Sequence, residues 1–281
     1  MGRLTLISRF LQCLIFIMLV FQLKSAMADK VYTVGVVPQF DSRTIDKIWR
    51  PVLDRLQKHT GFKFVLHASP SIPDFEQKFI NGDFDFAYLN PYHMLIASRK
   101  QGYIPLVRDT GRSLRGVLVV RKDSGIKDLS VLQGKVIAFP SPNALGASLL
   151  MRAELKRLHN LDIKPRYVKS HDSVYLNVVL GQAAAGGGVG KTLQRQSDEL
   201  KNNLRVLYRT SKTAPHPFAT HPRVQQKVWQ QVRSALLLMG STDSGRKLLA
   251  RIPMKQAGTA SLADYEPLKA MGLDSFYQEN P

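Results

Sequence analysis

The glycine-rich run at residues 185–192 is the segment of this sequence whose residue types most suggest catalysis. It reads Ala-Gly-Gly-Gly-Val-Gly-Lys-Thr, a relaxed form of the loop whose backbone amides cradle nucleotide phosphates. Such a loop follows a buried strand and opens a helix, whereas the preceding residues 174–180 have helical spacing. We therefore rank a nucleotide-dependent enzyme last of three candidate functions.

Residues 139–148 combine a strand end with a strong helix start, an arrangement that can bind an anion. Ser141 can cap the helix, and Pro142 suits its first position. The free amides that follow carry the positive end of the helix dipole, and small residues there let a ligand approach the backbone. An ordinary capped helix has the same pattern, so both interpretations stay open. The candidate ligand contacts here are Asn143, Ala144, Leu145 and Gly146.

Polar and aromatic residues at other predicted strand and helix ends supply the remaining candidate ligand contacts. Ligands of open α/β sheets bind where strands end, and side chains at those ends can orient them. Taken singly, each of these residues is also typical of ordinary loop chemistry. They are Gln39, Phe40, Tyr88, Asn90, Tyr92, Ser170, His171 and His216.

No constellation of catalytic or metal-ligating residues stands out in the sequence. His171 and Asp172 are sequence neighbours that would point apart on a helix, and no Gly-x-Ser-x-Gly elbow is present. Cys13, the single cysteine, lies in an N-terminal apolar segment, so the rest of the chain has no thiol chemistry. We expect a binding protein rather than an enzyme, with no catalytic residue, metal or cofactor.

Residues 1–28 have the pattern of a secretory signal peptide. A positive start precedes an apolar run over 11–23, and Ala-Met-Ala at 26–28 offers the small residues that signal peptidase accepts. The alternative is an uncleaved membrane anchor, but a run of about 13 residues is short of the roughly 20 that a spanning helix needs. We expect cleavage before Asp29 and a periplasmic location.

The chain is strongly basic, with a formal net charge of +19. Removal of residues 1–28, which hold three basic residues and no acids, leaves +16. Such an excess attracts anions, whether nucleic acid, anionic lipid or a small acidic solute. The lysines and arginines are scattered, and no basic stretch is interleaved with aromatic residues. We expect no nucleic-acid partner and interpret the charge as a sign of an anion-rich setting.

The elements that would position the candidate residues alternate between strands and helices in the first third of the chain. Strands are expected over residues 31–37, 62–67 and 85–89, and helices over 45–60 and 74–81. Pro51 lies inside the first helical pattern, so that helix is either kinked or begins nearer Trp49. The β-α-β-α-β order predicts a parallel sheet covered by helices.

The same alternation restarts after residue 113. Expected strands cover residues 114–121, 135–139, 166–168 and 204–208, and expected helices cover 129–132, 144–158 and 174–180. The tail is mostly helical, most strongly over 224–238 and 245–252. We expect an α/β protein with two lobes joined by two crossovers. After the signal at 1–28, lobe 1 would comprise residues 29–113 and 215–281, and lobe 2 residues 114–214.

The order and spacing of several segments are similar to those of a known family. The segments are residues 79–92 (Phe-Ile-Asn-Gly-Asp-Phe-Asp-Phe-Ala-Tyr-Leu-Asn-Pro-Tyr), 119–129, 132–139, 170–172 and 264–265. Over nearly the whole chain after the signal, they resemble the phosphate/phosphite/phosphonate-binding family of periplasmic solute-binding proteins that serve ABC transporters. The resemblance implies a type II periplasmic-binding fold with a ligand cleft between the lobes.

This chain departs from the family pattern at three places. The family's loop matching residues 143–147 is rich in Ser and Thr that grip a phosphonate, whereas this chain has Ala-Leu-Gly there. Alanines fill residues 183–185, where relatives place an Asp that binds an amino group, and residues 71–72 lack the usual aromatic contact. Two missing hydrogen bonds to a charged group weaken oxyanion binding by about two or more orders of magnitude. Either other donors compensate, or the ligand is a different solute.

The leading functional hypothesis is a periplasmic receptor that captures a small anionic solute, phosphonate-like, phosphate-like or another oxyanion, and delivers it to an ABC permease. Ligand contacts to both lobes would favour a closed cleft. The alternative is a sensory binding protein that reports its ligand state to a membrane sensor kinase, for which the fold is equally suited. In either role we expect a monomer.

Overall fold

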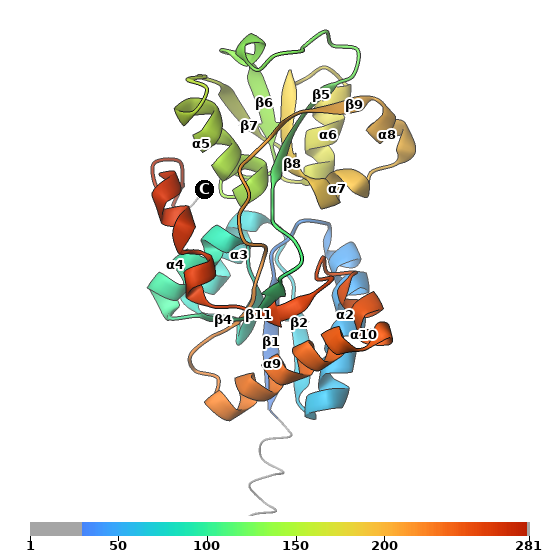
Figure 1. Ribbon diagram of the computed structural model, residues 1–281, viewed down its shortest axis with the longest axis vertical. Coiled ribbons are helices and arrows are strands. Elements are labelled where there is room, and N and C mark those ends of the chain that lie inside the picture. The colour runs from blue at the N-terminus through green and yellow to red at the C-terminus, as the bar shows by residue number, and fades with distance from the viewer. Residues whose placement is uncertain (1–29, 280–281) are drawn as a thin grey trace, which may run out of the picture.

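The computed structural model describes residues 30–279, so the predicted signal peptide lies outside the described residues. Two α/β lobes, one above the other in Figure 1, are joined by two extended segments. This confirms the predicted two-lobed α/β class. Within residues 30–279, no helix combines the length and the apolar content that a membrane crossing requires.

Lobe 1 is built on a six-stranded mixed sheet with strand order β11-β4-β10-β3-β1-β2. Strands β1, β2 and β3 are parallel, and β10 runs antiparallel to both β3 and β4. The strands are β1 (Val31–Val36), β2 (Lys63–His67), β3 (Phe86–Tyr88), β4 (Ile104–Asp109), β10 (Phe218–Thr220) and β11 (Ala257–Thr259).

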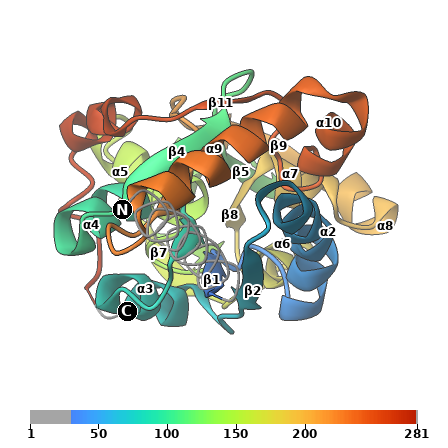
Figure 2. The same cartoon turned by 90° about the horizontal axis from the view of Figure 1, so that it is seen from below.

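Helices cover both faces of this sheet. Helix α2 (Ser42–Thr60) packs with α9 (Gln226–Ser241) and α10 (Asp243–Leu249), while α3 (Ile72–Asn81) packs with α4 (Pro91–Gln101). The view from below separates the two groups (Figure 2). Two short 3₁₀ helices, η3 (Leu262–Asp264) and η4 (Glu266–Met271), follow β11. The parallel strands therefore end at an edge that faces lobe 2.

Lobe 2 has a five-stranded sheet with strand order β7-β6-β8-β5-β9. Its strands are β5 (Gly116–Arg121), β6 (Val136–Phe139), β7 (Lys164–Tyr167), β8 (Ala185–Val189) and β9 (Leu204–Arg209). Its helical segments are η1 (Ser130–Leu132), η2 (Leu145–Leu149), α5 (Leu150–Arg157), α6 (His171–Val179), α7 (Gly190–Gln194) and α8 (Asp198–Asn202). Apolar clusters on both faces of the sheet bury α5 on one side and α6 on the other.

The two connecting segments run side by side between the lobes (Figure 1). Leu114 and Thr213 exchange backbone hydrogen bonds of 2.9 and 3.0 Å, so the outgoing and returning chains form a two-residue ladder. The chain after the return contributes β10 and β11 to the six-stranded sheet and α9 and α10 to the helices that pack with α2. The lobes are therefore tied at a narrow connection on which they can rotate.

Helix α2 shows apolar spacing at work. The residues on its inner side, all buried, are Ile45, Ile48, Trp49, Val52, Leu53 and Leu56. Asp41 caps its start by accepting a 3.0 Å hydrogen bond from the backbone N–H of Thr44. The helix runs without interruption from Ser42 through Pro51, so the alternative that it begins near Trp49 is wrong.

Strand β8 is the glycine-rich run, and its glycines are there for packing. A Cβ on Gly186 would come within 2.6 Å of Val174, one on Gly187 within 2.0 Å of the Ala147 carbonyl oxygen, and one on Gly188 within 2.1 Å of the Tyr175 hydroxyl. The strand is buried between β5 and β6, and its backbone pairs with both. These amides belong to a sheet and not to a loop, which removes the nucleotide-binding interpretation.

We expect Gly187→Ala to lower the free energy of unfolding by about 1–3 kcal/mol, because the added methyl overpacks against a backbone carbonyl that cannot move aside cheaply. Urea denaturation followed by circular dichroism measures this change. Gly190→Ala is the matched control, since no atom lies within 4 Å of its Cβ position. Equal stability of the two variants would contradict this account of the glycine run.

Candidate functional site

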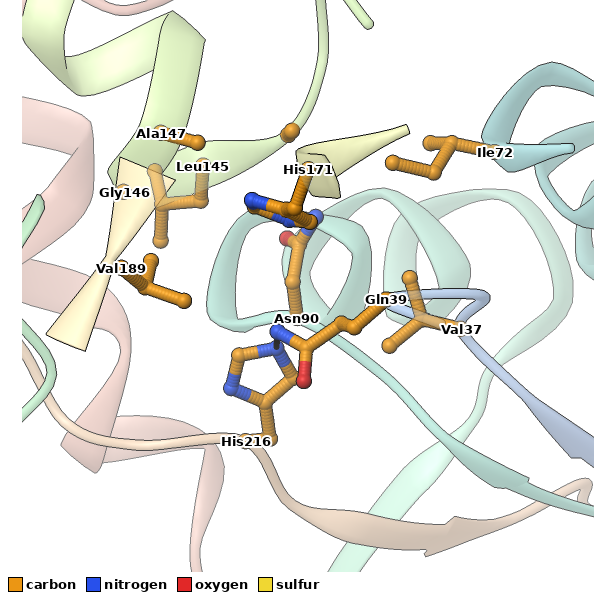
Figure 3. A pocket seen from close by; sticks show the side chains of 11 residues that line it. Val37, Gln39, Ile72, Asn90, Leu145, Gly146, Ala147, His171, Val189 and His216 are labelled. Atoms are coloured by element: carbon orange, nitrogen blue, oxygen red, sulfur yellow. Dashed lines mark hydrogen bonds between the residues drawn. The ribbon is translucent and has the colours of Figure 1, made fainter. Parts of the chain in front are cut away.

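A small buried cavity lies between the lobes and is our candidate ligand site (Figure 3). Lobe 1 contributes Val37, Gln39, Ile72 and Asn90, lobe 2 contributes Ala144, Leu145, Gly146, Ala147, His171 and Val189, and the return segment contributes His216. The cavity volume is about 20 Å³, on a measure by which one water needs about 10–15 Å³. The lobes are therefore closed, and any larger ligand requires them to part.

Asn90 is held by its position at the start of α4. Its side-chain oxygen accepts hydrogen bonds from the backbone N–H groups of Tyr92 (2.9 Å) and His93 (2.8 Å), as an N-cap does. The amide nitrogen is thereby turned toward lobe 2, where it donates to the carbonyl oxygen of Asn143 over 3.2 Å. Asn90 thus presents a fixed N–H donor at the mouth between the lobes.

The segment after β6 forms a π-helical turn rather than a capped α-helix. Ala144 is the N-cap with no side-chain cap, so the expectation that Ser141 caps the helix and Pro142 begins it is wrong. The N–H groups of Ser148 and Leu149 both donate to the carbonyl of Ala144, so the helical segment begins at Leu145 and not at Pro142. Turns of this kind often occur at functional sites.

Three backbone amides of this turn belong to residues that line the cavity and have no hydrogen-bond partner among residues 30–279. Within residues 30–279, the N–H groups of Leu145, Gly146 and Ala147 have no hydrogen-bond acceptor, and all three residues line the cavity. They stand at the start of a continuous helical stretch through η2 and α5, where the helix dipole is positive. Buried donors of this kind suit an oxygen-rich anion.

Two buried histidines flank the cavity, and both are neutral near pH 7. Burial lowers the pKa of His171 to about 4. Burial, and then the nearby His93 and His171, lower the pKa of His216 to about 3. Gln39 places its amide nitrogen 3.2 Å from Nε2 of His216, and an amide nitrogen only donates, so His216 accepts there and carries its proton on Nδ1. Each imidazole offers one donor and one acceptor.

In the part of the chain that the structure describes, no charged side chain and no hydroxyl group lines the cavity. Its polar groups are two amides, two imidazoles and the free backbone N–H groups, and the rest is apolar. The absence of hydroxyls agrees with the departure in residues 143–147 noted from the sequence. The site can therefore hold a compact oxyanion by neutral donors, with apolar contacts for a small substituent.

The structure brings together seven of the twelve predicted contacts in this lining: Gln39, Asn90, Ala144, Leu145, Gly146, His171 and His216. Tyr88 lies beneath His216 and stacks on it at 5.3 Å. Ser170 caps α6, and the ring of Phe40 packs under the guanidinium of Arg195 at 4.6 Å. Tyr92 lies outside the lining because its hydroxyl donates to Asp274 over 2.5 Å.

The apolar residues of the lining were not predicted from the sequence. Val37, Ile72, Ala147 and Val189 line the cavity but were not among the predicted contacts. Val189 is the last residue of a strand that the glycine run concealed, and Ile72 begins a helix that was expected to start at residue 74. The signal for Val37 was present, because it is the last residue of a predicted strand.

Asn143, another predicted contact, instead ties the two lobes and the C-terminal segment together. Its amide nitrogen donates to Oε2 of Glu76 (3.1 Å) and to the carbonyl of Gln278 (2.7 Å), and its oxygen accepts from the Gln278 N–H (3.0 Å). Glu76 is 1% exposed, and its Oε1 lies 2.7 Å from Nε2 of His93. Asn143 thus provides a hydrogen-bond donor to a buried carboxylate.

Asn143→Ala should lower the free energy of unfolding by about 2–3 kcal/mol, because buried polar groups on Glu76 and Gln278 lose their partner. Chemical denaturation measures the loss. The exposed Asn203, which donates to the Glu199 carbonyl, provides the control Asn203→Ala. A loss at Asn143 no greater than at Asn203 would show that the interlobe bonds do not stabilise the fold.

Comparisons with known proteins agree with this architecture. The family model described as ABC transporter, phosphonate, periplasmic substrate-binding protein matches residues 34–265. A binding protein component of an ABC phosphonate transporter from Pseudomonas aeruginosa is similar in structure, with a TM-score of 0.78 and 17% identity over 86% of this chain and 85% of that one. PhnD1 from Prochlorococcus marinus in complex with methylphosphonate gives 0.78 and 18% over 88% and 98%. A Xanthomonas citri protein bound to ATP gives 0.70 and 18% over 88% and 99%.

Proposed function

The chain belongs to the family of periplasmic substrate-binding proteins of ABC phosphonate transporters, and on that premise we propose that its ligand is a small phosphonate- or phosphate-like oxyanion held in the buried cavity. Proteins of this family capture a solute and pass it to a membrane permease for uptake. The predicted role as a solute-binding protein is thereby confirmed. The chemistry of the bound solute is our proposal.

The observation that carries this proposal is the set of three unpaired amides at Leu145, Gly146 and Ala147. Buried N–H groups without acceptors are costly, and a ligand that supplies oxygen atoms relieves that cost. Hydrogen bonds from such groups to a charged ligand contribute about 1.5–3 kcal/mol each. Three such hydrogen bonds, together with those from the imidazole donors, offset the loss of the hydroxyl donors that the loop lacks.

Cleft closure is the mechanism that this arrangement supports. The amides and His171 belong to lobe 2, whereas Gln39 and Asn90 belong to lobe 1, so only the closed form brings both sets to one ligand. A ligand shifts the equilibrium toward the form it contacts better. Release to a permease then requires the lobes to part again.

Isothermal titration with methylphosphonate, phosphate, phosphite, sulfate and short carboxylic acids tests the proposal. We expect phosphorus oxyanions to bind and to raise the melting temperature, with carboxylic acids weaker because they offer fewer oxygens to the three amides. If no phosphorus oxyanion binds and another class does, the ligand assignment is wrong while the fold and the transport role remain.

We further propose that the chain is exported through cleavage of residues 1–28, acts as a monomer and performs no catalysis. We also propose lobe boundaries at 113/114 and 214/215, which the membership of the two sheets supports. Mass spectrometry of the protein recovered from the periplasm checks the first residue, and light scattering checks the monomer. A mature chain that still contains residues 1–28 would favour the alternative that these residues are an uncleaved membrane anchor.

A further inference from the structure

A second hollow opens directly beside the buried cavity, and its charge is unlike that of the cavity. The two share Gln39, Val189 and His216, so both lie against these side chains. The second hollow has a volume of about 250 Å³. The other residues lining it are Tyr88, Arg112, Ser113, Leu114, Arg115, Gly190, Lys191, Gln194, Arg209, Pro215 and Pro253. We call it the basic chamber.

Among residues 30–279, four cationic residues line the basic chamber, and no Asp or Glu does. The side chains of Arg115, Lys191 and Arg209 make no hydrogen bond or ion pair with any residue in the range 30–279. Arg112 is the exception, and its partner is weak: its Nε lies 3.7 Å from Oδ2 of Asp109. The chamber therefore keeps most of its positive charge uncompensated.

The carboxylate of Asp109, which Arg112 approaches, is already engaged elsewhere. Asp109 is 1% exposed, and its two oxygens accept hydrogen bonds from the backbone N–H groups of Gly111 (2.9 Å), Lys255 (2.9 Å) and Gln256 (3.2 Å). Those bonds hold Asp109, at the end of β4, beside the chain near β11. They leave only a long contact between Asp109 and Arg112. Asp109 cannot serve as the counter-ion of the whole chamber.

The pKa of Lys191 reflects the electrostatic repulsion in this arrangement. Partial burial, followed by the positive charges of Arg195, Arg112 and Lys255, lowers the pKa of Lys191. Like charges held together in a half-closed hollow repel one another, and an anion placed among them removes that repulsion. Lys191 is also the lysine of the glycine-rich motif. Packing accounts for the glycines of β8 but not for this lysine.

We propose that the natural ligand carries two anionic groups, with its phosphonate or phosphate head in the cavity and a second phosphate, phosphonate or carboxylate group in the basic chamber. The ligand class is a short organophosphonate or organophosphate with a second charge a few bonds from the head. This rests on the proposed function for the head group. His216 and Gln39 lie where the linker between the two groups passes.

The placement of the cations gives the second group a role in closure. Arg112 and Arg115 belong to the outgoing connection, Arg209 precedes the returning one, and Lys191 belongs to α7 of lobe 2. A second anion contacts the connection and lobe 2 together, so it adds contacts that a single oxyanion in the cavity does not make. Affinity should therefore rise with the second charge and not with ligand size.

Titration calorimetry with three ligands tests this: methylphosphonate, 3-phosphonopropionate, and 3-phosphonopropionamide as the neutral counterpart of the second. We expect the wild type to bind 3-phosphonopropionate about 10- to 100-fold more tightly than the amide, the value of one hydrogen bond to a charged group. That preference should shrink with added salt, because the chamber is open to solvent. Equal affinities for the acid and the amide would overturn the proposal.

Lys191→Gln supplies the matching variant. It should reduce affinity for 3-phosphonopropionate about tenfold or more and leave methylphosphonate within about twofold. Lys212→Gln removes the same charge from the return segment outside the chamber lining and should change neither. A parallel loss for both ligands in Lys191→Gln would mean that the lysine acts on the head and would refute the chamber. If none of the three ligands binds the wild type while sulfate or another anion does, the head assignment fails separately.

Discussion

The Asn90→Asp variant should lose affinity for a phosphorus oxyanion by about three orders of magnitude and still fold. The substitution keeps the oxygen that caps α4 through the N–H groups of Tyr92 and His93, and Asp is as good an N-cap as Asn. It replaces the amide nitrogen, which faces the cavity and the Asn143 carbonyl, with a carboxylate oxygen. A bound anion about 4 Å away then meets a like charge, worth about 4 kcal/mol at an effective dielectric constant of about 20.

Calorimetry with methylphosphonate measures the loss, and thermal denaturation without ligand shows whether the fold persists. We expect the melting temperature to change little, because the open cleft relieves the contact between the new carboxylate and the Asn143 carbonyl. Asn203→Asp places the same charge change on the surface of lobe 2, where Asn203 is exposed, and should leave binding intact. Undiminished binding in Asn90→Asp would remove the cavity as the oxyanion site.

The ligand-free protein should lose stability steeply on acidification from pH 7 to pH 5. The pKa values of His171 and His216 are about 4 and about 3 in the folded chain, below the value of about 6.5 in the unfolded chain. As the pH falls below 6.5, the unfolded chain binds protons that the folded chain does not, so the free energy of unfolding falls until the pH approaches 4. At pH 5 the expected loss is about 2 kcal/mol for each histidine.

Urea denaturation at pH 7, 6 and 5 measures this loss. The double variant with His171→Gln and His216→Gln should show a flatter dependence on pH, whereas His59→Gln, at an exposed histidine, should not. A saturating oxyanion ligand should also flatten the profile, because a neighbouring negative charge favours the protonated imidazoles. An unchanged slope in the double variant would show that these two rings do not control acid stability.

Elements with one apolar and one polar side could be predicted from the sequence. Helix α2 was recognised because its six inner residues recur at helical spacing and its other side is solvated. Helix α4 was missed because Pro91 to Ala97 are all buried, so no polar side marks a period. Strand β8 was missed because three packing contacts demand glycine where strands ordinarily have branched residues.

The same physical reason separates the site residues that could be predicted from the sequence from those that could not. Polar residues next to predicted strand and helix ends, such as Asn90 and His171, were found because topology brings such ends together. The interlobe role of Asn143 could not be found, because its partners Glu76 and Gln278 lie far from it in sequence and carry no local pattern. The π-helical turn was likewise hidden, since its sequence is also that of a capped α-helix.

We expect the C-terminal segment to slow the exchange of solute. Besides Gln278, the carbonyl of Phe276 accepts a 2.8 Å hydrogen bond from Arg152 of α5, so a third attachment joins the lobes in addition to the two crossovers (Figure 1). An opening that separates this segment from lobe 2 breaks these bonds, so we expect them to lengthen the residence time of a trapped solute and to delay its entry. Affinity and turnover would then depend on Phe276 and Gln278, neither of which lines the cavity or the basic chamber.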